Sequence, residues 1–171
     1  MRRRNLYPYL LSSAIIALDQ ITKAVIVHLI PENGIGLRCL SDFLWIVHVR
    51  NDAVAFSMGS GLAIAAKYAL FVVLPILFMA MVAYAIASDR FEHEISVFER
   101  WCLAGILGGG IGNIIDRLFR NLRVVDWIST ATYGFLGMER WPTYNIADAS
   151  VVISVILLLL AFVAERKRKD E

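Results

Sequence analysis

The run ADASVVISVILLLLAFVA, Ala147–Ala164, decides the fold class of this chain. Apart from Asp148 near its start, the run holds only apolar residues and two serines, and its length falls within the roughly 17–25 residues that a helix needs to cross a membrane. An ionised carboxylate in or near hydrocarbon costs at least about 2.5 kcal/mol. We therefore expect Asp148 to have either a partner or a chemical task.

Three further apolar runs precede this one, at Leu10–Ile30, at Ile64–Ala87 and at Trp101–Ile115, the last being long enough to cross only if it extends to about Val97–Leu118. The chain has 171 residues, is 58% hydrophobic and has a mean hydropathy of +0.63, which is more apolar surface than one soluble core can bury. We predict a single membrane-embedded domain over residues 1–171, an all-α integral membrane protein with four transmembrane helices at about 10–30, 64–87, 97–118 and 147–164.

The charges at the two ends predict the orientation. Arg2–Arg4 precede the first run and Arg166–Lys169 follow the last, and basic flanks favour the cytoplasmic side. Both termini and the short loop Ser88–Arg100 are then cytoplasmic, whereas the longer loops, residues 31–62 and 119–146, face outward. The first run resembles a signal peptide in its basic start, but no small-residue cleavage site follows it, so we interpret it as a helix. A net charge of +2 without a basic stripe does not indicate nucleic-acid binding.

The two outer loops have distinct patterns. Phe43–Val49 is rich in aromatic and β-branched residues and follows Ile35–Leu40, with Ser41-Asp42 as a turn between them, which predicts a small β platform. The second outer loop, between the third and fourth spans, carries aromatic residues of the kinds that settle at the lipid headgroups, which predicts an interfacial loop. These residues are Trp127, Tyr133, Phe135, Trp141 and Tyr144.

Cysteine and histidine are sparse. Cys39 lies in the first outer loop and Cys102 near the cytoplasmic end of the third span, too far apart to form a disulfide. The histidines, His28, His48 and His93, occur singly. Since ligand spacing is lacking, we expect neither a metal site nor a cofactor.

Polar residues inside the first and third spans have structural interpretations. Asp19 and Lys23 are four residues apart, on one helix face, and can neutralise each other within the bundle. Gln20 and Thr22 can bond across helices. The small-residue pairs Gly105/Gly109 and Gly108/Gly112 allow close helix packing.

The outer ends of the third and fourth spans are also polar. Asn113 and Arg117 share one helix face, which suggests a polar site. An arginine whose side chain extends to the membrane interface would also explain the position of Arg117. Asn145 can cap the fourth helix, and an acid such as Asp148 is favoured in its first turn. Capping does not explain Asp126, the acid in the apolar run Val-Val-Asp-Trp-Ile on the same side of the membrane.

Asp126 and Asp148 therefore form a candidate pair. When two carboxylates lie close together, one pKa rises, so that one group holds a proton while the other accepts one from water, which favours a hydrolytic site. An ion- or proton-coupled transporter or channel subunit is the main alternative, because intramembrane carboxylates also mark proton paths. The placement of both Asp126 and Asp148 at one membrane surface, rather than along a path across the membrane, disfavours a transporter or channel subunit. A non-enzymatic membrane scaffold is the third alternative, and the presence of both aspartates disfavours that.

Five motifs in order along the chain resemble those of the bacterial lipoprotein signal peptidases, the signal peptidase II family. They are Asp19-Gln20-Ile21-Thr22-Lys23, Asn51 with Ala55-Phe56-Ser57, the run from Gly108 to Arg117, Val124-Val125-Asp126, and Asn145-Ile146-Ala147-Asp148. The resemblance implies an aspartic endopeptidase of the bacterial inner membrane, without a metal, that removes the signal peptide of a diacylglyceryl-modified prolipoprotein before its lipidated cysteine. We expect it to act as a monomer.

The resemblance also assigns residues. It implies that Asp126 and Asp148 are the catalytic pair and that the motif residues around them support catalysis or bind substrate: Asn51, Asn113, Arg117, Asn145, Asp19 and Lys23. The second motif departs from the family pattern, because Ala53 stands where a glycine is usual and Val54 follows it. Between the aspartates, Gly134 and Gly137 suggest a movable cover.

Overall fold

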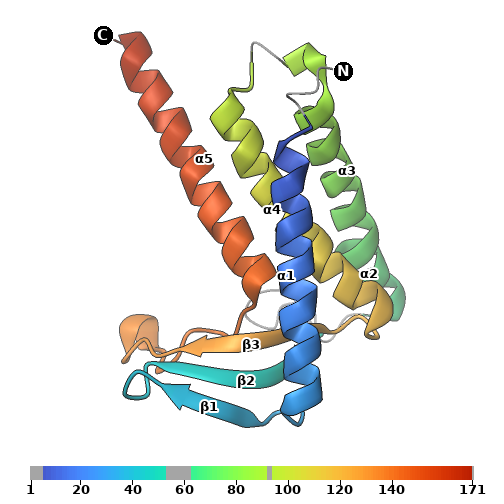
Figure 1. The fold of residues 1–171 in the computed structure, drawn as a ribbon, viewed down its shortest axis with the longest axis vertical. Coiled ribbons are helices and arrows are strands. Elements are labelled where there is room, and N and C mark those ends of the chain that lie inside the picture. The colour runs from blue at the N-terminus through green and yellow to red at the C-terminus, as the bar shows by residue number, and fades with distance from the viewer. Residues whose placement is uncertain (1–5, 53–62, 92–93, 171) are drawn as a thin grey trace.

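The fold is that of a computed structural model, which describes residues 6–52, 63–91 and 94–170. The basic stretch Arg2–Arg4 and the second-motif residues from Ala53 to Ser57 lie outside the described residues. Within them, four helical segments are long and apolar enough to cross a membrane. They stand on a small sheet at one end, and both chain ends lie at the other (Figure 1). The predicted fold class is confirmed.

The four segments begin and end close to the predicted positions. They are α1 (Pro8–Leu29), the continuous stretch Ile64–Ala87, α4 (Val97–Phe119) and α5 (Ile146–Asp170). The second comprises α2 (Ile64–Tyr68), a π-helical turn η3 (Ala69–Val73) and α3 (Leu74–Ala87). Pro75, just after that turn, has no N–H for the carbonyl four residues earlier, and its ring crowds that carbonyl. The widened turn accommodates both effects.

Helix α4 is the central helix, packed against α1, α3 and α5. Its glycines permit this packing. A Cβ on Gly109 would meet Ser150 Oγ at 2.5 Å and Val151 of α5 at 2.7 Å, and one on Gly108 would meet Ser12 of α1 at 3.0 Å. A Cβ on Gly110 would likewise meet the side chain of Met79 of α3. The predicted packing role of these small residues is confirmed.

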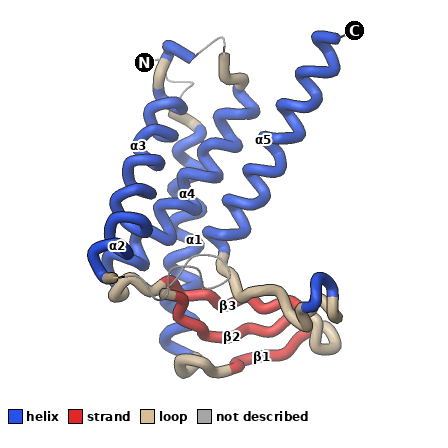
Figure 2. The backbone as a smooth tube through the Cα atoms, turned by 180° about the vertical axis from the view of Figure 1, so that it is seen from behind, coloured by secondary structure: helices blue, strands red, loops and turns tan. Residues whose placement is uncertain are grey.

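The sheet has three antiparallel strands in the order β1–β2–β3 (Figure 2). Strands β1 (Ile35–Cys39) and β2 (Leu44–Asn51) form the predicted platform. Strand β3 (Val124–Thr130) was not predicted from the sequence, whose pattern indicated an interfacial loop for these residues. It pairs with β2 so that Asp126 lies opposite Val49 and Val124 opposite Asn51. Asp126 is therefore held by a strand rather than at the end of a transmembrane helix.

The remainder of the second outer loop folds back on the sheet. It contains a short 3-10 turn, η5 (Phe135–Gly137), flanked by Gly134 and ending at Gly137, both at positive φ. Arg140 fixes it: its guanidinium lies 3.9 Å from the Trp45 ring centroid and donates to Ser129 Oγ at 2.8 Å. The loop thus forms a hairpin that Arg140 holds against the sheet.

The two cysteines lie at opposite ends of the molecule, as predicted. Cys39 ends β1 and Cys102 is buried near the start of α4, and both are free thiols. The short connection between α3 and α4 holds a 3-10 turn, η4 (Asp89–Phe91). Ser96 then caps α4 in a capping box with Glu99.

Candidate active site

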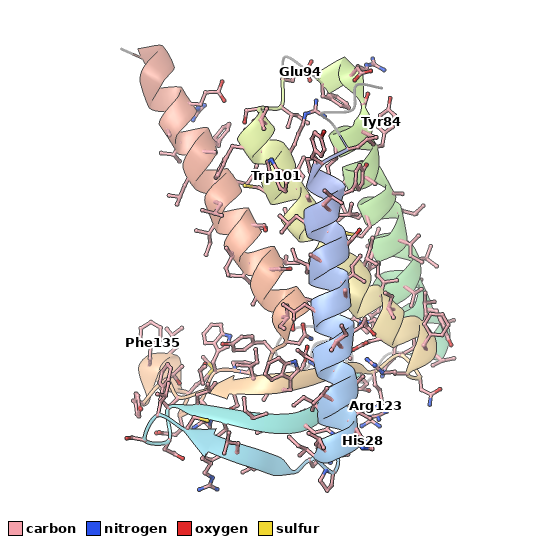
Figure 3. All side chains as sticks on the ribbon, in the orientation of Figure 1. His28, Tyr84, Glu94, Trp101, Arg123 and Phe135 are labelled. Carbon is pink, nitrogen blue, oxygen red and sulfur yellow. The ribbon has the colours of Figure 1, made fainter. Side chains whose placement is uncertain are left out.

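The two candidate aspartates come from elements that approach each other where the helices stand on the sheet. Figure 3 labels Arg123 and His28 at this end of the molecule and Glu94 at the other. Asp126 comes from β3 and Asp148 from the first turn of α5. Asn145 joins them. Its side-chain Nδ2 donates to Asp126 Oδ1 at 2.8 Å, and its backbone N–H donates to Asp148 Oδ2 at 3.1 Å.

Asn145 also caps α5. Its Oδ1 accepts from the backbone N–H of Asp148 at 2.9 Å, while Asp148 Oδ2 accepts from the backbone of Asn145, a reciprocal capping box. Because its Oδ1 is engaged by a donor, the amide must direct its Nδ2 outward, toward Asp126. The predicted cap is confirmed, and the cap also orients the amide that contacts the second acid.

All four carboxylate oxygens of the pair accept a hydrogen bond from an amide. The two bonds from Asn145 reach one oxygen of each acid. Asn51 Nδ2 donates to Asp126 Oδ2 at 3.2 Å, and Asn113 Nδ2 donates to Asp148 Oδ1 at 2.7 Å. Such donors stabilise ionised carboxylates. The structure therefore brings Asn51, Asn113 and Asn145 to the pair, as the resemblance implied.

The surroundings of Asp126 raise its pKa, whereas these donors lower it. Its side chain is only 2% exposed, and burial together with the charge of Asp148 raises its pKa to about 7, against the lowering effect of Asn51, Asn145 and Lys23. A carboxyl group with such a pKa exchanges its proton near neutral pH. The pair can thus hold one proton and offer one ionised carboxylate, the arrangement that general acid and base catalysis requires.

Arg117 lies beside the pair rather than extending to the interface. Its guanidinium carbon is 5.2 Å from the centroid of the Phe71 ring, and its charge acts on Asp148, Asp126 and Asp116. The side chain is half-buried. It therefore supplies positive charge next to both acids, and the snorkelling interpretation does not describe it.

Asp19 and Lys23 form the predicted ion pair, at 2.8 Å, and both side chains are fully buried. Asp116, for which the sequence predicted no role, lies 3.0 Å from Lys23 Nζ and is also fully buried. Its position three residues after Asn113 on one helix face was the available signal. Gln20 bonds across to Gly112 and Asp116 of α4 as predicted. Thr22 does not: its hydroxyl donates to carbonyls of its own helix, at Leu18 and Asp19.

Comparisons with known proteins agree with this architecture. The family model described as signal peptidase (SPase) II matches residues 11–164. A lipoprotein signal peptidase of Treponema pallidum is 34% identical over 98% of this chain and 88% of its own length, and one of Treponema denticola is 38% identical over 95% and 94%. A solved bacterial membrane enzyme superposes with a TM-score of 0.79 at 27% identity, covering 95% of this chain and 91% of its own.

Proposed function

Because this chain belongs to the signal peptidase II family, we propose that Asp126 and Asp148 are the catalytic pair with which it cleaves the signal peptides of prolipoproteins. The chain is a multi-pass bacterial membrane protein and a peptidase of the aspartic type. The alternative of a transporter or channel subunit has no support among its relatives.

The observation that carries the residue assignment is the double contact of Asn145, whose side chain binds Asp126 and whose backbone binds Asp148. One residue, through its side-chain amide and its backbone N–H, thus holds two acids that come from different elements. Paired acids that share a proton are the arrangement of aspartic peptidases. This geometry and the raised pKa of Asp126 support the assignment.

In the proposed reaction, the ionised carboxylate takes a proton from water while the water oxygen bonds to the scissile carbonyl carbon. The protonated carboxyl group donates to the carbonyl oxygen, which becomes a hydroxyl in the tetrahedral intermediate. As the C–N bond breaks, the acid that took a proton from water gives it to the leaving nitrogen, and a hydroxyl of the intermediate returns its proton to the other carboxylate as the carbonyl re-forms. The two acids titrate as a unit, and each exchanges its role as the cycle proceeds.

The neighbouring polar groups have supporting roles in this proposal. Asn51, Asn113 and Asn145 hold the carboxylates in place through the donors described above. Arg117 stabilises the negative charge that develops at the carbonyl oxygen, since a fixed cation acts strongly in a site sheltered from water.

We place the site at the surface of the inner membrane that faces away from the cytoplasm, with both termini in the cytoplasm. The basic residues at the two ends favour this orientation. The site lies at the opposite end of the bundle from the termini (Figure 1). The substrate is a diacylglyceryl-modified prolipoprotein, cut before its lipidated cysteine, and its acyl chains remain in the bilayer as the scissile bond reaches the pair.

Cleavage of matched substrates tests this proposal. Purified protein in detergent receives one prolipoprotein in two forms, with and without the diacylglyceryl group on its cysteine. We expect the lipidated form to be cut far faster, because remote binding energy positions the scissile bond. Equal rates would refute lipid recognition. No cleavage of either form would refute the peptidase assignment.

A further inference from the structure

The ammonium group of Lys23 is fully buried and has three acceptors. Its Nζ lies 2.8 Å from Asp19 Oδ2 and 3.0 Å from Asp116 Oδ2, and it donates to Asn113 Oδ1 at 2.9 Å. An ammonium group has three N–H bonds, so these acceptors engage all of them. None of the acceptors belongs to Asp126 or Asp148.

Each of the two carboxylates that bind Lys23 also holds backbone next to the proposed catalytic pair. Asp19 Oδ1 accepts from the N–H of Ala147 at 3.1 Å, and Asp116 Oδ2 accepts from the N–H of Val125 at 2.9 Å. Ala147 directly precedes Asp148, and Val125 directly precedes Asp126. Through two carboxylates, one ammonium thus links the N-terminus of α5 to the start of β3.

The third contact of Lys23 sets the direction of an amide. Since an ammonium group only donates, Asn113 must turn its Oδ1 toward Lys23, which leaves its Nδ2 to face Asp148. The same Oδ1 accepts from Asn145 Nδ2 at 3.2 Å. Asp148 therefore receives a donor from Asn113, whereas a flipped amide would present an oxygen to it.

We propose that Lys23 is a positioning residue for the reaction: from one buried ammonium group it fixes the backbone beside both aspartates and the amide direction of Asn113. This inference rests on the proposed function of Asp126 and Asp148. Charged groups from each packed element face this cluster: Asp19 from α1, Asp116, Arg117 and Arg120 from α4, Asp126 from β3 and Asp148 from α5.

A purely structural ion pair would behave differently on replacement. Buried ion pairs contribute little net stability over apolar residues of similar shape, because desolvation offsets their attraction. Removing charges of both signs together leaves no unpaired charge. A structural role therefore predicts a variant whose folded molecules keep the wild-type kcat.

Two charge-balanced double variants separate these roles. In both, Asp19→Asn keeps an oxygen for the N–H of Ala147. Lys23→Met then removes every donor, and Lys23→Gln keeps an amide donor on a shorter side chain. The control is Arg100→Met, which removes a buried cation at the far end of α4, where Arg100 donates to the carbonyl of Ala85 at 3.2 Å. All are assayed on lipidated prolipoprotein, with kcat expressed per folded molecule.

We expect the Met double variant to lose about 10–100-fold in kcat with KM changed by less than about threefold, because small displacements of reacting groups are costly. The Gln double variant should lose only about 3–10-fold, and Arg100→Met should retain its kcat. A wild-type kcat in the Met double variant would overturn the inference. If that variant does not fold, the Gln variant decides: a kcat within about twofold of wild type would overturn the inference, and a larger loss at unchanged KM would support it.

Asp126→Asn in the same assay distinguishes the two proposals. If it is inactive while the double variants match the wild type, only the positioning role of Lys23 fails. If Asp126→Asn itself cleaves at the wild-type rate, the proposed catalytic pair fails.

Discussion

Asn145 and Asp148 exchange hydrogen bonds: the backbone N–H of Asp148 donates to Asn145 Oδ1 at 2.9 Å, and the backbone N–H of Asn145 donates to Asp148 Oδ2 at 3.1 Å. This exchange closes the first turn of α5 and fixes an acid in the candidate site at the same time. The helix start and the site therefore depend on the same two residues.

Replacing Asn145 separates capping from orientation. Asn145→Ala loses the cap and the donor to Asp126, and should lower stability by about 0.5–2 kcal/mol. Asn145→Ser keeps a capping oxygen but has no amide to reach Asp126, so it should recover most of the stability. We expect kcat to stay low in both, by about 10–100-fold. Thermal unfolding and kcat, measured side by side, check this. Full activity in the serine variant would show that the amide donor is not needed.

The pH dependence of the reaction follows from Asp126. Burial and the charge of Asp148 raise its pKa to about 7, so the last proton of the pair leaves near neutrality. The rate should fall as pH rises through about 7, because both acids are then ionised and none can donate. Profiles of kcat/KM against pH, which report the groups of the free enzyme, measure this fall in rate.

Replacing Asn51 should shift the pH at which the rate falls. Its donor at 3.2 Å favours the ionised form of Asp126, so Asn51→Ala should move the fall in rate to higher pH. A fall at an unchanged or lower pH would show that the fall does not report Asp126.

The membrane orientation predicts which side of the membrane each loop reaches. Cys102 is buried, so labelling native cysteines cannot report both sides. In a variant lacking both native cysteines, Glu139→Cys in the outer loop and Asp89→Cys between α3 and α4 are exposed reporters. A membrane-impermeant maleimide added to spheroplasts should label the first at once and the second only after permeabilisation. The reverse pattern would invert the orientation.

The contact between α4 and α5 depends on Gly109. A larger side chain there would press on Ser150 and Val151 and push α5, which carries Asp148, away from α4. Gly109→Leu should therefore lower stability by about 1–3 kcal/mol and reduce kcat. Ala65→Leu adds similar bulk at an exposed position of α2 and should change neither. Equal effects of the two substitutions would argue against close packing at Gly109.

The sequence predicted the helices well because a membrane span has a length and a composition of its own. It did not predict β3, because Val124–Ile128 forms a strand only by pairing with β2, and a short apolar run does not reveal its partner. The role of Asp116 was missed for a related reason. Its contact with Lys23 depends on how α1 and α4 are rotated against each other, which neither helix shows alone.

For the site, the resemblance named a group of residues that the structure brings close together, but it did not reveal their connections. The three asparagines contact the pair directly, whereas Asp19 and Lys23 act one contact away, through Ala147 and Asn113. Spacing places residues on a helix face, but hydrogen-bond partners between elements appear only once the elements are assembled.

The central claim is that Asp126 and Asp148 perform the acid and base steps together. Its most direct test is the kcat of Asp126→Asn and of Asp148→Asn on lipidated prolipoprotein, with Asp42→Asn, an exposed aspartate of the platform, as the matched control. We predict that each catalytic substitution lowers kcat by about 10²–10⁴-fold in protein that remains folded, and that the control keeps its rate. A rate near wild type in either Asp126→Asn or Asp148→Asn would contradict the account.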